Sequence, residues 1–117
     1  MSTLIENVQA TLSPLVAGGC WYATNTAQPP VFPFITFQRI VSPTNNSFAG
    51  PSDVQNTIFQ IDIFSRQMSE LIPLQATIEA AFVAATYTAI QQDQRDGYEP
   101  DIKAFRCSMD YSCWSAN

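Results

Sequence analysis

The chain contains no histidine, and charged residues make up only 13% of its 117 positions. Without histidine, neither a Ser-His-Asp nor a Cys-His nucleophile can be assembled, and histidine metal sites are excluded as well. The four glycines, Gly18, Gly19, Gly50 and Gly97, fit neither a Walker A loop nor a Gly-x-Gly-x-x-Gly turn. We therefore expect no enzyme activity, and no catalytic, cofactor-binding or metal-binding residues.

Basic residues are also scarce, with five Lys and Arg against ten Asp and Glu and a net charge of −5. The basic side chains are scattered and form no patch that would neutralise a phosphate backbone, which excludes tight binding of nucleic acid. A neutral or acidic surface still permits nucleic acid to pass freely. The acidic residues gather between Asp93 and Asp101, and this stretch predicts a solvated loop.

The three cysteines, Cys20, Cys107 and Cys113, form no Cys-x-x-Cys pair, so a zinc site is not indicated. Cys107 and Cys113 fall on one predicted strand, which separates them by about 20 Å and places them beyond disulfide reach. We expect free buried thiols in a reducing cytosol. The first twelve residues carry no Lys or Arg, and no apolar run approaches the ~18 residues of a membrane span. The sequence thus predicts neither a signal peptide nor a membrane helix.

What the chain does have is strand-forming sequence. Residues 33–40 and 56–65 are rich in β-branched and aromatic side chains, and residues 42–52 between them are dense in turn formers. Polar side chains interrupt both runs, which is typical of strands with one face in a core and the other open to a partner. Residues 104–114 alternate between apolar and polar and predict a half-buried strand, and residues 20–24 predict a short one.

Apolar side chains at helical spacing predict two helices, over residues 3–12 and about 69–91. The second carries a stripe from Leu71 to Ala89 that predicts packing on a sheet. The order is helix, strand, strand, strand, helix, strand. It predicts one domain over residues 1–117 of the α+β class, an antiparallel-rich sheet of about four strands with two helices packed on one face.

The composition also predicts an oligomer. Fourteen aromatic residues (8 Phe, 4 Tyr and 2 Trp) accompany the low charge, which indicates that other subunits cover part of the surface. The alternative is an ordinary domain with a surface rich in Ser, Thr, Asn and Gln. On strand 56–65, the residues expected to face the helices are Phe59, Ile61 and Ile63. The open face then carries a candidate subunit or partner interface of Ile58, Gln60, Asp62 and Phe64. The alternative is the opposite register, which would bury Asp62 at a cost unless Arg39 or Arg106 paired with it.

Two further residues complete this candidate interface. Arg39 and Asp62 are the only opposite charges embedded in the two strongest strands, and we expect them to form an ion pair within or between subunits. Phe48 lies at the centre of the connection 42–55, which is long for a compact domain. We expect that loop to project and dock on a neighbouring subunit or assembly partner; the alternative is that Phe48 folds back on its own core.

Four segments in order carry a family resemblance: Pro33-Phe-Ile-Thr-Phe-Gln-Arg-Ile40, Gly50-Pro51, Gln60-Ile-Asp-Ile-Phe64 before an Ala-rich helix, and Met109-Asp-Tyr-Ser-Cys-Trp114. Over essentially the whole chain this order resembles the small tail-completion (tail-terminator) proteins of long-tailed bacteriophages. Cys113 stands where an aliphatic residue is usual in that family, and residues 20–30 have no counterpart in it.

The resemblance implies a structural virion protein of the tail or neck, assembled in the host cytoplasm without cofactor or membrane. Such proteins form a ring, usually a hexamer, that caps the tail tube and ends its polymerisation. The ring joins the tail to the head connector, and DNA passes through its lumen. The implied partners are other copies of the chain, the tail tube protein and the head-tail connector proteins. Alternatives are a neighbouring head-tail joining or head-closure protein, and a small-molecule binding module or single-carboxylate enzyme.

Overall fold

The structure is a computed structural model, and it describes residues 4–26, 30–41, 46–47, 50–51, 54–85 and 87–116. Its elements, in chain order, are α1 (Leu4–Leu12), a 3₁₀ turn (Ser13–Leu15), β1 (Cys20–Tyr22), β2 (Phe34–Val41), β3 (Asn46–Ser47), β4 (Gly50–Pro51), β5 (Val54–Ser65), α2 (Met68–Val83), β6 (Thr88–Glu99) and β7 (Ala104–Ala116). Neither described helix is long and apolar enough to cross a membrane.

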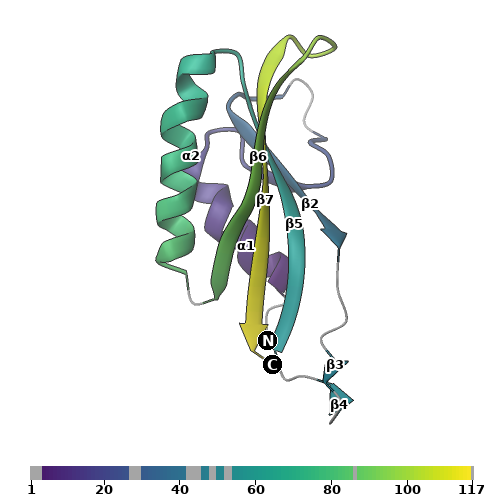
Figure 1. The fold of residues 1–117 in the computed structure, drawn as a ribbon. Helices are drawn as coiled ribbons and strands as arrows, with labels where there is room; N and C mark the ends of the chain where they lie inside the picture. Colours follow the sequence, from purple (N-terminus) through teal and green to yellow (C-terminus); the bar gives the residue numbers. More distant parts are fainter. Residues whose placement is uncertain are drawn as a thin grey trace.

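Five of the strands form one sheet in the order β1-β2-β5-β7-β6. β1 runs parallel to β2, and the other neighbours are antiparallel. Figure 1 shows α1 and α2 on the same side of this sheet, which leaves its other face open. The α+β prediction with two helices on one face is therefore confirmed, with five strands in place of about four.

The additional strand lies where the second helix was expected to continue. α2 ends at Val83, and β6 begins at Thr88 and pairs along β7. Thr88 and Ile90 are β-branched and favour a strand once pairing is available. The stretch from Asp93 to Asp101 is largely exposed, as predicted, but the prediction of a loop is wrong for its residues up to Glu99, which belong to the edge strand β6. Charged side chains on an edge strand discourage pairing with another chain.

The core lies between the helices and the sheet. The predicted alternation on β5 is confirmed, because Phe59, Ile61 and Ile63 are fully buried. The buried side chains of α2 include three residues of the predicted stripe. They are Leu71, Ile78 and Phe82. α1 adds its own three, which are Leu4, Val8 and Leu12. All of these side chains belong to one contiguous cluster.

The prediction of free buried cysteines is confirmed for the described residues. Cys20, Cys107 and Cys113 are all buried and unbridged. β7 is continuous from Ala104 to Ala116 and keeps the last two thiols apart. Burial raises the pKa of each thiol from 9.0 to about 12.

The connection between β2 and β5 contains a small second sheet. β3 and β4 pair antiparallel, with Ser47 opposite Gly50. Figure 1 shows this hairpin beyond one end of the five-stranded sheet. Phe48 lies outside the described residues, so its predicted docking role stays a prediction.

Candidate assembly surfaces

The outward side of α2 has an uncharged stripe, flanked by the exposed residues Glu70 and Glu79. Ile72 and Val83 are the most exposed large apolar side chains among the described residues, at 66% and 78%. The other residues exposed in this stripe are small or uncharged. They are Pro73, Ala76, Thr77, Ala80 and Ala84, the last just past the end of the helix. A surface helix of a monomer normally turns a charged or polar face to solvent. We call this surface, from Ile72 to Ala84, the helix face.

Both carboxylates of α2 are held by the chain's own sheet. Ser65 Oγ donates a hydrogen bond of 2.5 Å to Glu70 Oε1, at the start of the helix. Tyr111 Oη donates one of 2.7 Å to Glu79 Oε2, near the middle. These contacts draw the two acidic side chains of α2 toward the sheet, at the flanks of the helix face. The uncharged character of that face thus results from named interactions as well as from composition.

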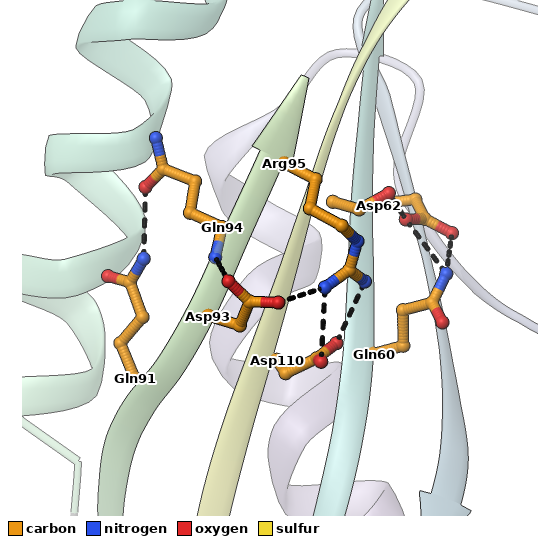
Figure 2. Close-up of polar contacts among 8 residues, drawn as sticks. Gln60, Asp62, Gln91, Asp93, Gln94, Arg95 and Asp110 are labelled. Atoms are coloured by element: carbon orange, nitrogen blue, oxygen red, sulfur yellow. Dashed lines mark hydrogen bonds and ion pairs between the residues drawn. The ribbon is translucent and has the colours of Figure 1, made fainter. Parts of the chain in front are cut away.

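The open face of the sheet carries a polar belt across its middle (Figure 2). Ser108 Oγ donates to Asp62 Oδ1 at 2.5 Å, and Gln60 Nε2 contacts both Asp62 oxygens at 3.2 Å. Ser108 lies directly opposite Asp62 in the register of β5 and β7. The carboxylate of Asp62 is therefore positioned by two neutral donors.

The belt continues onto β6 through Arg95. Its guanidinium bridges Asp110 at 3.3 Å and Asp93 at 2.5 Å. Figure 2 shows Arg95 reaching between these two carboxylates. The hydrogen bonds and charges of both raise the pKa of Arg95 above its ordinary value, with Asp110 contributing most. One guanidinium against two carboxylates leaves this part of the belt with a net negative charge.

An apolar patch lies beside the belt on the same face. Ile58 and Ile90 flank Ser112 from the two sides of β7, and Trp114 follows on β7 two residues further along. Ile90 is 52% exposed and Trp114 is 37% exposed. We call Ile58, Ile90 and Trp114 the sheet patch. It lies on the opposite side of the sheet from the helices.

A pocket of about 390 Å³ lies on the other side of the belt. The rings of Phe34 and Phe64, on neighbouring strands, stack in it with centroids 4.9 Å apart. Asp62 and Thr36 line it as well. The walls come from residues 23–25, Pro30 and Ile102. We call it the Asp62 pocket.

The structure brings four of the predicted interface residues together. Ile58, Gln60, Asp62 and Phe64 all face away from the helices, with their side chains only partly buried. Their predicted role in contacts between subunits stays a prediction. Sequence reasoning missed the helix face, although the absence of basic residues between Arg66 and Arg95 is a readable signal for it.

The expected ion pair between Arg39 and Asp62 within one chain is wrong. Arg39 lies opposite Phe59, whereas Asp62 lies opposite Thr36. Side chains alternate between the faces of a strand, so Arg39 shares the side of the buried Phe59 and Asp62 the open side. Among the described residues, the ion pairs are those of Arg95 and Arg106. Pairing between subunits is not affected by this correction.

The comparisons agree with a structural role in assembly. The chain matches the family model described as "Tail completion protein gp17" over residues 6–116. A search of curated proteins finds none that matches the chain. The family match covers most of α1, all of α2 and the whole five-stranded sheet. The chain therefore belongs to the tail completion protein family and is a structural protein of the bacteriophage tail.

Proposed function

We propose that the chain forms a closed ring, hexameric as is usual for such proteins, that caps the tail tube and ends its polymerisation. The ring joins the tail to the head connector, and DNA passes through its lumen. The observation that carries the proposal is the pair of uncharged surfaces on opposite sides of the molecule, the helix face and the sheet patch.

Symmetry explains why opposite surfaces favour a ring. A contact that uses the same patch on both subunits closes at a dimer and leaves any second patch uncovered. A contact between two different patches repeats from subunit to subunit and closes into a ring when the rotation permits. Burying the helix face of one copy on the sheet patch of the next removes both apolar surfaces from water throughout the ring.

The two edge strands of the sheet favour a contact between subunits through the faces of the molecule and not through the sheet edges. β1 is only three residues long, which limits strand addition at that edge. β6 presents Asp93, Arg95 and Asp96 along the other edge. Short or charged edge strands resist pairing with another chain. The proposed ring therefore uses side-chain packing and does not extend the sheet.

The charge of the chain is compatible with passage of DNA. The net charge is −5, with only five basic residues. A lumen lined by neutral or acidic side chains does not retain a polyanion, because retention requires phosphate neutralisation. The proposal therefore expects DNA transit without measurable affinity for DNA.

A tube-capping experiment tests the function. Tail tube protein is polymerised alone, with the purified chain, and with Val83→Glu, a change on the helix face. We expect the wild-type chain to shorten the tubes and a gold-labelled chain to decorate one tube end in electron micrographs. The variant is expected to leave tube length unchanged. Unchanged tube length with no label at a tube end contradicts capping. In a parallel mixture with purified head connector, label on the connector would then support the neighbouring head-tail joining role.

A further inference from the structure

We propose that the Asp62 pocket receives the Arg39 side chain of a neighbouring copy of the chain. Each contact between subunits would then contain one desolvated Arg–Asp pair beside the apolar contact. The inference rests on the proposed ring and names a specific pair of residues within its subunit contact.

The two residues project from opposite faces of the sheet. Arg39 is exposed near the end of β2 and shares the helix side with Phe59. Asp62 is on the open side, opposite Thr36 on β2 and Ser108 on β7. A head-to-tail contact places the helix side of one copy against the open side of the next. Because Arg39 and Asp62 lie on opposite sides of the sheet, they cannot pair within one chain, but a head-to-tail contact brings Arg39 of one copy toward Asp62 of the next.

The pocket has the chemistry that a guanidinium needs. The Asp62 carboxylate is oriented by Ser108 and Gln60, and neither of these donors carries a charge. No described cation forms an ion pair with it. The stacked rings of Phe34 and Phe64 lie in the same pocket. Arginine pairs with carboxylates in a planar fork and stacks on aromatic rings, so this combination favours arginine over lysine.

Arg39 is the arginine that remains available. The other arginines have partners within the chain: Arg66 lies over the ring of Phe32, Arg95 pairs with Asp93 and Asp110, and Arg106 pairs with Glu99. For the Arg39 guanidinium the described residues supply no carboxylate. The charges of Arg39 and Asp62 lie on opposite sides of the sheet and are complementary between copies.

Charge reversal and exchange test the pair. Arg39→Asp and Asp62→Arg are each expected to weaken assembly by about tenfold or more, since one charge then lacks its partner in the contact. The double variant is expected to recover a large part of the loss, because coupled residues give non-additive effects. Asp96→Arg, a charge reversal on the edge strand β6 that also removes a contact with the Cys107 thiol, is expected to fold and to assemble normally. Assembly is measured by native mass spectrometry, and folding by circular dichroism.

A cross-linking experiment provides a second readout. Chains with Arg39→Cys and chains with Asp62→Cys are mixed and treated with a short bis-maleimide; the native thiols are buried. We expect covalent dimers between the two variants. Suppose that the wild type assembles. If Asp62→Arg then behaves like Asp96→Arg, or if no mixed dimers form, the Arg39–Asp62 pair is contradicted and the proposed ring is not. A wild-type chain that stays monomeric overturns both.

Discussion

Tyr111 on β7 donates a hydrogen bond to Glu79 on α2, with 2.7 Å between the two oxygens. The contact links the middle of the helix to a fully buried tyrosine of the sheet. Burial raises the pKa of Tyr111 most, and the hydrogen bond and charge of Glu79 raise it further. The pair draws an acidic side chain toward the sheet, at the flank of the helix face.

Removing the hydroxyl tests this contact. Tyr111→Phe deletes the donor and leaves Glu79 to water, which we expect to lower the free energy of unfolding by about 1 kcal/mol. A thermal melt should show a midpoint lower by about 4 °C. Tyr98→Phe is the control, because Tyr98 is half exposed on the edge strand. Equal midpoints for both variants contradict a stabilising Tyr111–Glu79 bond.

Neighbouring glycines are expected to differ sharply in tolerance to alanine. A Cβ on Gly18 would lie 1.9 Å from the carbonyl oxygen of Val31, a backbone atom, so Gly18→Ala forces the chain apart. A Cβ on Gly19 meets only Trp21 Nε1 at 3.7 Å, although its φ of +79° adds strain. In urea unfolding, we expect the free energy of unfolding to fall by about 3 kcal/mol or more for Gly18→Ala and by ~1 kcal/mol for Gly19→Ala. The reverse order contradicts the packing described here.

The thiols are expected to make the fold sensitive to alkali. Each thiol has a pKa of about 12 when folded against 9.0 when unfolded, so the unfolded state loses its protons first as the pH rises. Their contribution to stability is complete below about pH 9 and declines between about pH 9 and pH 12. Thermal midpoints across this range measure it.

The same burial predicts slow modification of the folded chain. At pH 8 a thiol reagent is expected to react with all three cysteines only after unfolding, because the thiolate is the nucleophile and the thiols are buried. Rapid reaction in the native state contradicts this assignment.

Part of the fold could be predicted because the alternation of apolar and polar residues along a strand follows the burial of its side chains. On β5, Phe59, Ile61 and Ile63 lie under the helices as the pattern predicts, and the open side carries Asp62. On β7 the residues facing the helices, Cys107, Met109, Tyr111 and Cys113, are buried as the pattern predicts, but Ser108 and Ser112 on the open side are buried too. A strand with one buried face has its period fixed by the core, so sequence alone defines its faces.

Other features could not be predicted from the sequence, for identifiable physical reasons. β6 is an edge strand with mostly exposed side chains and a bulge between Gln91 and Asp93, so no apolar alternation marks it. β2 and β5 are joined by a long connection, which does not fix their register as a two-residue turn would. The face of Arg39 relative to Asp62 therefore depended on the folded structure.

The helix face is expected to be needed for assembly but not for folding. Val83→Glu places a charge on a side chain that is 78% exposed, so the monomer should melt as the wild type does. In a subunit contact the same charge would be desolvated, and we expect loss of the ring. Val31→Glu, at a site that is 54% exposed and belongs to neither the helix face nor the sheet patch, should assemble normally. Assembly of Val83→Glu at wild-type concentrations contradicts the helix-face contact.

Mixing complementary variants tests the head-to-tail contact most directly. Val83→Glu keeps an intact sheet patch, and Ile90→Glu on that patch keeps an intact helix face. In native mass spectrometry of this 13.0 kDa chain, each variant alone is expected to be monomeric. An equimolar mixture is expected to give a one-to-one heterodimer that grows no further. No heterodimer in the mixture, together with homodimers of Ile90→Glu alone, would contradict the head-to-tail contact and indicate a symmetric helix-to-helix contact.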